Sequence, residues 1–385
     1  MPRPDTDIAI LGGGCAGLSL GRRLATSKTA KRVVILEPRE TYTDDRSWCF
    51  WAARNHANAH LVAQSWPRWR FSTNAGSTAT HCMPGLRYQY VRGQDFYDDA
   101  RAQIDRYDAI RLEPGTHADR VVHSADVYRI ETDQGALTAN AVIDTRPLPR
   151  DQPALLYQCF LGAEVTHSPL SAADVEVAGL MEAMSTDKDG FRFVYILPLA
   201  PDRSLIEITR FCNRRVAPNS LREQLSAEIM RLLGADTQIV RTEAGVLPMG
   251  LMRQAPRTGG PQQVFAGLPG GALRPASGYA FQRIQAWADA CAASVTSGRG
   301  VIGHRPEPAL RALMDRIFLH ALRAHPERSP DFFMAMAERL RPDAFVRFMS
   351  DAATVGDKMN VVTALPPAPF LKAAWTALRA QEIAA

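Results

Sequence analysis

TDIAILGGGCAGLSLGRRLA, residues 6–25, is the stretch that decides the fold. Its apolar, partly β-branched start predicts a strand over residues 6–10, and a glycine-rich turn and an apolar helical segment follow at once. The turn fits the pattern G-x-G-x-x-G, whose glycines permit a tight turn, bring backbone N–H groups to a pyrophosphate and let the helix pack close to the strand. The positive end of the helix dipole would face the phosphates. We therefore predict a dinucleotide site whose loop comprises Gly12, Gly13, Gly14, Cys15, Ala16 and Gly17.

A second predicted strand supports the dinucleotide site. Residues 31–37, KRVVILE, form a largely apolar run that ends in Glu37. An acid about 20 residues beyond the last glycine is where such domains hold a ribose hydroxyl. An arbitrary glycine-rich turn is the alternative, and the position of Glu37 argues against it. The expected fold class is α/β, with a Rossmann-like nucleotide-binding domain.

The composition limits the class of protein. The chain has 385 residues, of which 46% are hydrophobic and 22% charged, as in globular proteins, and this length predicts two joined lobes. The net charge of +5 is spread over many arginines without a dense basic block, so we expect no nucleic-acid partner, whereas an anionic membrane surface is compatible. The six cysteines form no C-x-x-C pair, which indicates reduced thiols and no metal site. With no signal-peptide pattern and no membrane-spanning run, a cytoplasmic location is expected.

We expect four portions along the chain. Residues 1–150 would mainly form the nucleotide-binding domain and residues 151–260 a β-rich substrate lobe. Residues 261–300 would return to the nucleotide-binding domain, and residues 301–385 would form a helical C-terminal part because their apolar residues recur at helical spacing.

Glu207 is a carboxylate inside an otherwise apolar predicted strand. Residues 191–199 and 204–211 are predicted strands joined by a short Pro-containing turn, which is typical of a hairpin. Alternation places Glu207 on one face with Leu205 and Thr209. A catalytic acid and a carboxylate paired with an arginine both fit this position, and the arginines nearby in the sequence are Arg192, Arg203 and Arg210.

Three other segments carry candidate site residues. The segment RSWCFW, residues 46–51, would place its aromatic side chains near the cofactor or in the core. Asp144 ends the predicted strand AVID. It would be either a second polar contact to the cofactor region or an ordinary acid at the end of a strand. Gly267 follows a short predicted strand, and a loop rich in small residues comes after it.

Several motifs, in a fixed order over essentially the whole chain, resemble those of bacterial lycopene β-cyclases. GFRFVYILPLAP, residues 190–201, followed by LIE, residues 205–207, is similar to the signature of that family. RSWCFW resembles its D-R-[ST]-W-x-F segment, and EAGVLP, residues 243–248, its E-x-G-x-L-P turn. GALRPASGY, residues 271–279, is similar to its G-x-x-x-P-[TS]-[TS]-G-Y loop, and Asp357-Lys358 and PPAPFL, residues 366–371, follow in the right order.

Two positions depart from the family pattern. Many relatives carry a second acid directly after the catalytic glutamate, where this chain has Ile208, and some carry a histidine where it has Arg274. The first departure leaves Glu207 as the sole carboxylate of that motif. Together the two departures bear on the substrate and on whether one or both ends are cyclised.

The resemblance implies an FAD-dependent enzyme with a fold like that of the flavoprotein monooxygenases. It would convert acyclic ψ end groups of lycopene into β-ionone rings by a redox-neutral acid/base cyclisation. Glu207 would protonate the terminal alkene, because burial raises the pKa of a carboxyl group and keeps it neutral. Reduced FAD would stabilise the cation or donate the proton, with NAD(P)H or a partner reductase as the source of electrons.

The resemblance also implies which residues contact FAD and substrate. Besides the glycine-rich loop, the expected FAD contacts are Glu37, Arg46, Asp144, Gly267, Pro275, Ala276, Ser277, Gly278 and Tyr279. The expected substrate pocket comprises Trp48, Phe50, Phe193 and Tyr195, whose rings would hold a cation or would pack in the core.

A hydrocarbon of the size of lycopene would be taken from a membrane. The C-terminal helices would either dock on the inner face of the cell membrane or pack as core elements. The apolar side chains concerned are Phe332, Phe333, Phe345, Phe348, Phe370 and Trp375. Other carotenoid-pathway enzymes are expected partners. The alternative functions are a flavin-dependent monooxygenase or halogenase acting on another terpenoid or aromatic substrate, another polyene cyclase, and a non-catalytic flavin-binding partner.

Overall fold

The predicted first strand lies inside an eight-stranded sheet in the computed structural model, which describes residues 3–124, 127–147, 149, 152–251 and 258–382. β1 runs parallel to β2 on one side and to β11 on the other. The carboxyl ends of these three strands therefore meet at one edge of the sheet, where ligands of such folds bind. The strands of this sheet are β1 (Thr6–Leu11), β2 (Val33–Glu37), β8 (Ile110–Pro114), β9 (Ala118–Ser124), β10 (Val127–Thr132), β11 (Gly135–Asp144), β17 (Thr258–Gly260) and β18 (Gln263–Phe265).

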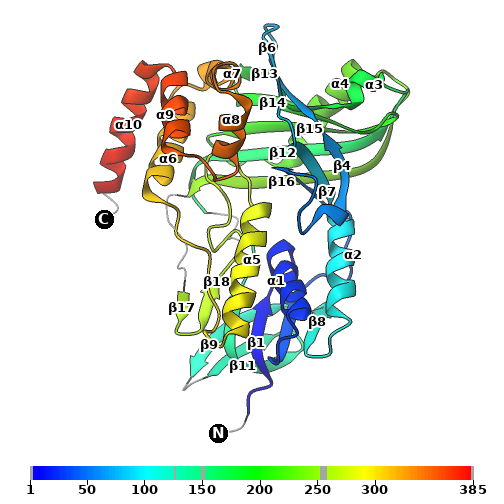
Figure 1. Ribbon diagram of the computed structural model, residues 1–385, viewed down its shortest axis with the longest axis vertical. Coiled ribbons are helices and arrows are strands. Elements are labelled where there is room, and N and C mark those ends of the chain that lie inside the picture. The colour runs from blue at the N-terminus through cyan, green and yellow to red at the C-terminus, as the bar shows by residue number, and fades with distance from the viewer. Residues whose placement is uncertain (1–2, 125–126, 148, 150–151, 252–257, 383–385) are drawn as a thin grey trace.

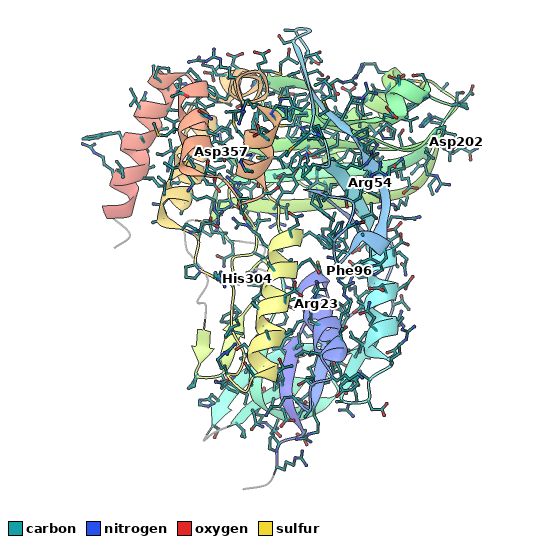
Figure 2. The ribbon with its side chains drawn as sticks, in the orientation of Figure 1. Arg23, Arg54, Phe96, Asp202, His304 and Asp357 are labelled. Carbon is teal, nitrogen blue, oxygen red and sulfur yellow. The ribbon has the colours of Figure 1, made fainter. Side chains whose placement is uncertain are left out.

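α1 (Cys15–Thr26) and α2 (Gly93–Ile104) pack on this sheet, and α1 packs against both α2 and α5 (Phe281–Thr296). α1 approaches the sheet closely at Gly21, where an added Cβ would lie 2.5 Å from Cδ1 of Ile35. Arg23 on α1 donates a hydrogen bond of 2.8 Å to Asp289 on α5, and Figure 2 shows Arg23 beside that helix. These helices and the sheet share one apolar core.

A second sheet of seven strands lies at the other end of the molecule (Figure 1). Its order is β16-β12-β15-β14-β13-β5-β6, and every neighbouring pair is antiparallel except β13 and β5. Its strands are β5 (Arg68–Thr73), β6 (Thr78–Cys82), β12 (Ala154–Thr166), β13 (Val177–Asp187), β14 (Gly190–Ala200), β15 (Arg203–Cys212) and β16 (Gln238–Leu251). The predicted hairpin is confirmed as β14 and β15. β5 and β6 come from the first 150 residues, so the N-terminal part of the chain also contributes to this sheet.

A third, smaller sheet contacts helices of the first sheet's core and a strand of the second sheet. This three-stranded sheet has the order β3-β7-β4, formed by β3 (Ser47–Ala52), β4 (Val62–Trp66) and β7 (Arg87–Arg92). The remaining short elements are the 3-10 turns η1 (Ala59–Leu61), η2 (Pro218–Leu221) and η3 (Pro326–Arg328) and the helices α3 (Ala172–Val175) and α4 (Arg222–Leu233). α4 packs on β15, on the sheet face that carries Ile206 and Ile208.

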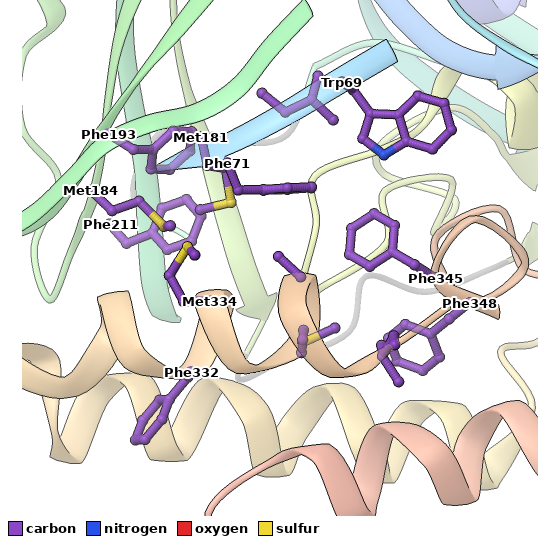
Figure 3. Close-up of a cluster of buried hydrophobic side chains, with 14 of the residues drawn as sticks. Trp69, Phe71, Met181, Met184, Phe193, Phe211, Phe332, Met334, Phe345 and Phe348 are labelled. Carbon is purple, nitrogen blue, oxygen red and sulfur yellow. The ribbon is translucent and has the colours of Figure 1, made fainter. Parts of the chain in front are cut away.

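Five C-terminal helices form a cap beside the second sheet (Figure 1). They are α6 (Ala309–Ala324), α7 (Ser329–Arg339), α8 (Pro342–Met349), α9 (Val355–Ala364) and α10 (Pro367–Glu382). Figure 2 shows Asp357 of the cap and Asp202 of the β14–β15 turn at opposite ends of this sheet. In Figure 3, Phe71 and Phe193 of the sheet face Met334 and Phe345 of the cap, and together they belong to the largest apolar core.

Candidate active site

The glycine-rich turn joins the end of β1 to the start of α1. Gly12 has φ +99°, which favours glycine, and an added Cβ on Gly17 would lie 2.0 Å from the carbonyl oxygen of Gly12. Gly14 is different, because a Cβ there would meet nothing within 4 Å. Gly14 is also the N-cap of α1, with no side-chain hydrogen bond at the cap and no acid in the first turn. The turn therefore presents open space in front of uncapped helix N–H groups.

Glu37 lies against this turn. Its carboxylate accepts a hydrogen bond of 2.7 Å from the backbone N–H of Gly13. The carboxylate also accepts one of 2.7 Å from the side chain of Arg39, while the Tyr42 hydroxyl donates one of 2.8 Å to the Gly13 carbonyl. The structure thus brings together the glycine turn and the predicted acid. Arg39 and Tyr42 were not among the predicted contacts, because they stand in a polar loop with no motif of its own.

Three other residues that were expected to contact FAD, namely Asp144, Arg46 and Cys15, have neighbours unlike those of Glu37. Asp144 ends β11 at the same sheet edge, but its carboxylate is bound by Arg146 at 2.6 and 3.0 Å. Arg46 is half-exposed and paired with Asp45 at 2.7 Å. Cys15 begins α1, and burial raises the pKa of its thiol to about 12, so this thiol stays neutral.

A second loop meets the glycine turn from far along the chain. Gly267 has φ +66°, and an added Cβ there would lie 3.0 Å from the Cβ of Ala16. Backbone hydrogen bonds to Arg274 close the predicted segment from Pro275 to Tyr279 into a loop. The N–H of Arg274 donates to the carbonyl of Tyr279 at 3.0 Å, and its carbonyl accepts from the N–H of Gly278 at 2.9 Å. This loop links the nucleotide-binding end to the cavity described next.

An apolar cavity of about 320 Å³ lies between the second sheet and the cap. Phe193 and Tyr195 line it, and so do Ala276, Ser277 and Tyr279 of the loop, which were expected as FAD contacts. The rest of its wall is mostly apolar and includes Trp51, Phe71, Leu180, Met181, Phe211, Met314, Phe318, Phe333, Phe345, Phe348, Val362, Leu365, Phe370 and Leu371. A space of this size and character suits one end of a hydrocarbon chain.

Trp48 and Phe50 are not among the residues that line this cavity, although Phe50 lines a neighbouring one together with Trp51, Arg274 and Tyr279. Their rings stack on Phe281 of α5 with centroid distances of 5.3 Å each. Because successive side chains of a strand point to opposite faces, it is Trp51 of β3 that reaches the cavity wall.

Glu207 lies in the middle of β15 and is buried, with 8% of its surface exposed. It pairs in register with Tyr195 on β14, which lines the cavity, although Glu207 itself is not one of the lining residues. Burial, and then the negative charge of Glu243, raise the pKa of Glu207 to about 8, while a hydrogen bond of 2.8 Å from Thr209 opposes this rise. Glu207 is therefore neutral at pH 7 and able to donate a proton.

None of the three arginines considered as partners of Glu207 pairs with it in the described chain. Arg192 pairs with Glu228, Arg203 with Glu164 and Arg210 with Asp187. The catalytic alternative is the one that this geometry favours.

Glu243 was missed as a site residue. It stands on β16, and its carboxylate accepts hydrogen bonds of 2.8 Å from the Ser47 hydroxyl and from Arg241. The sequence marked Glu243 only as the start of a turn motif. Ile208, by contrast, lies in the apolar cluster on the other face of the sheet, so an acid there would not face Glu207.

The fold and these loops define the class of protein: an α/β protein with the architecture of flavin-dependent monooxygenases and related reductases. A geranylgeranyl bacteriochlorophyll reductase-like protein from Thermoplasma acidophilum superposes with a TM-score of 0.61 at 12% identity, covering 95% of this chain and 98% of the other. p-Nitrophenol 4-monooxygenase from Pseudomonas putida gives a TM-score of 0.57 at 11% identity, covering 97% and 98%. These likenesses confirm the predicted fold class.

The chain belongs to the family described as lycopene cyclase protein, whose sequence model matches residues 7–375. The lycopene beta-cyclase of a Paracoccus species is 28% identical, covering 94% of this chain and 95% of that protein. Those of Pseudescherichia vulneris and Pantoea ananas are 26% and 24% identical and each covers 96% of this chain, and the match extends over 96% and 97% of their own lengths. The resemblance drawn from the motifs is confirmed.

Proposed function

We propose that this protein is a lycopene β-cyclase that converts acyclic ψ end groups of lycopene into β-ionone rings. The observation that carries the proposal is the buried carboxyl group of Glu207, which has no arginine partner among the described residues and lies beside an apolar cavity in a member of the lycopene cyclase family. An alkene is a weak base, so its protonation needs an acid that burial keeps uncharged.

The chain's own side chains account for the steps. Glu207 gives its proton to the terminal alkene, which leaves a tertiary cation in the cavity. The faces of Tyr195 and Tyr279 hold that cation, and the apolar wall excludes water that would otherwise capture it. The internal double bond closes the ring, and loss of the C6 proton to a carboxylate completes it without net oxidation.

FAD fits the glycine turn. The open space at Gly14 and the uncapped N–H groups of α1 suit a pyrophosphate, and Glu37 lies where a ribose would be held. The Gly267 loop and residues 275–279 would contact the flavin between this turn and the cavity. When bound and reduced, FAD supplies negative charge that stabilises the cation, and NAD(P)H is the reductant that we propose.

We also propose that the protein takes its substrate from the inner face of the cell membrane. No helix among the described residues is long and apolar enough to cross a membrane. Exposed apolar side chains recur at i, i+4 and i+7 on the two last helices; this α9–α10 face comprises Val355, Met359, Val362, Leu371, Trp375 and Leu378. Val362 and Leu371 also line the cavity, so the face borders it. Lys358, Lys372 and Arg379 lie on the same helices and would favour anionic lipid.

This surface differs from the predicted one. Phe332, Phe345 and Phe348 are buried in the core, and Phe333 stacks on Phe191 with a centroid distance of 5.1 Å. Phe370 packs on Phe332. Of the six predicted contacts, Trp375 is the one that is exposed in the described chain, at 60%.

The experiment is an anaerobic incubation of the purified protein with FAD, a reductant and lycopene in liposomes, followed by chromatography of the pigments. β-Carotene or γ-carotene formed only with reduced flavin supports the cyclase. Glu207→Gln should abolish this product, whereas Glu182→Gln, a change of another buried glutamate on β13, should not. An oxygenated product that requires O₂ and survives Glu207→Gln would instead identify a monooxygenase.

A further inference from the structure

Two buried carboxyl side chains flank one glycine in the second sheet. Gly162 on β12 pairs in register with Glu207 on β15 and with Glu243 on β16. Residues directly opposite one another in a sheet point to the same face. An added Cβ on Gly162 would lie 3.2 Å from the Cβ of Glu207 and 3.3 Å from the Cγ of Glu243. Both glutamates therefore occupy the space that a side chain at position 162 would fill.

The two carboxyl groups have different partners. Glu243 accepts hydrogen bonds from Ser47 and from the guanidinium of Arg241, each at 2.8 Å, which stabilise its anion. Glu207 accepts one from Thr209 and forms no ion pair within the described ranges. Burial raises the pKa of Glu243 too, but Arg241 and Ser47 oppose that rise, so of the pair Glu243 is the carboxylate and Glu207 the carboxylic acid.

We propose that Glu243 is the positioning partner of Glu207, and that the two carboxyl groups together hold the single proton that cyclisation uses and recovers. This inference rests on the proposed cyclase function. The O–H bond of Glu207 breaks as a C–H bond forms on the terminal alkene, which leaves two carboxylates facing the cation. A ring C–H bond then breaks and an O–H bond re-forms on the pair, so no external acid, base or oxidant is consumed.

Glu243 would act at two stages of the reaction. Its charge opposes ionisation of Glu207 before the reaction. After proton transfer, the combined negative charge of the pair stabilises the cation and favours return of the proton.

The other titratable groups around Glu207 do not change charge in the relevant range. Burial raises the pKa of Tyr195 on β14, of Cys49 on β3 and of Tyr279 in the loop, so these three stay neutral. The neighbouring carboxylates raise the pKa of Arg241, which stays protonated. Arg241 is also paired with Asp44 at 3.1 Å and with Glu164 at 2.8 Å, so these two carboxylates share the guanidinium that binds Glu243.

The test is an infrared titration of the protonated carboxyl band in the purified full-length protein. In the unchanged protein we expect a band that is lost near pH 8 and is absent from Glu207→Gln. In Glu243→Gln the same band should titrate at least about one pH unit lower, because a neighbouring negative charge is gone. The alkaline limit of cyclase activity should shift by the same amount. A titration of Glu207 that Glu243→Gln leaves unchanged would overturn the proposal.

A matched control and a second variant keep the test decisive. Glu182 is also buried and also bound by an arginine and a serine, Arg70 and Ser72, so Glu182→Gln should leave the Glu207 band unchanged. If Glu243→Gln does not fold, Ser47→Ala keeps the carboxyl of Glu243 and weakens its anion, so the pair holds its proton more tightly and the band should be lost at a higher pH than in the unchanged protein. An unchanged band in Ser47→Ala would then count against the pair. The infrared result does not depend on turnover, so failure of the pair and failure of the cyclase function are distinguishable.

Discussion

The guanidinium of Arg274 donates two hydrogen bonds of 3.1 Å to the carboxylate of Asp315, and both side chains are buried. Arg274 also donates to the backbone carbonyl of Phe348. One residue of the loop that leads to the cavity is thereby tied to α6 and α8 of the cap. The departure from the histidine of some relatives thus has a structural role, since the arginine reaches two elements of the cap at once.

Arg274→Ala should lower the free energy of unfolding by about 3 to 5 kcal/mol, because it leaves the buried carboxylate of Asp315 without its partner. Chemical denaturation followed by circular dichroism measures this loss. The control is Arg341→Ala, which removes an arginine that is 76% exposed and paired with Asp343, and which should change stability by about 0.5 kcal/mol or less. Equal effects of the two changes would show that the buried pair does not hold the loop to the cap.

Gly17→Ala and Gly14→Ala should separate folding from nucleotide binding. An alanine at position 17 would place its Cβ against the Gly12 carbonyl, so we expect a loss of about 3 kcal/mol in stability. An alanine at position 14 meets no protein atom within 4 Å and should cost about 1 kcal/mol or less, as the loss of a glycine N-cap, but it fills the space proposed for the pyrophosphate. Thermal denaturation and titration with FAD measure the two effects. Tight FAD binding by Gly14→Ala would exclude this turn as the pyrophosphate site.

The nucleotide site was predictable because its signal is local. The strand, the turn and the helix are consecutive in the sequence, and Glu37 ends the next strand. The hairpin that carries Glu207 was predictable for the same reason. The approach of Glu207 and Glu243 over Gly162 was not predictable, because it depends on the register of two strands that both pair with β12.

The sequence also does not predict which face of a strand or helix is covered by another element. Alternation in residues 47–52 separates Trp48 and Phe50 from Trp51, but it does not say which face meets α5 and which meets the cavity. In the cap, helical spacing marks apolar faces without telling which of them a sheet covers. Phe345 is covered in this way, whereas Met359 is not.

Met359→Asp and Trp375→Asp should weaken binding to vesicles that contain anionic lipid by about tenfold or more each, since each removes an apolar side chain from the α9–α10 face. Vesicle sedimentation measures the bound fraction, and added salt should weaken binding further because the lysines contribute. Met230→Asp is the control: Met230 is 55% exposed on α4, away from this face, and its change should not affect binding. The same loss in all three variants would contradict a specific docking surface.

Glu207→Gln should be more stable than the unchanged protein, and the difference between the two should grow as the pH rises. The pKa of Glu207 is about 8 in the folded protein and about 4.5 when the side chain is in water, so the folded state retains a proton that the unfolded chain releases between these values. Stability therefore falls as the pH rises through this window, and above about pH 8 the folded protein carries an additional buried charge. Glutamine has no such charge, so we expect Glu207→Gln to gain roughly 2 to 4 kcal/mol at pH 9 and much less at pH 5, since one pKa unit corresponds to about 1.4 kcal/mol. Unfolding midpoints of the two proteins across this range measure the gain, and a pH-independent difference would show that Glu207 ionises normally in the folded state. Because the same residue is proposed to donate the proton, a variant that is more stable and inactive is what a strained catalytic acid predicts.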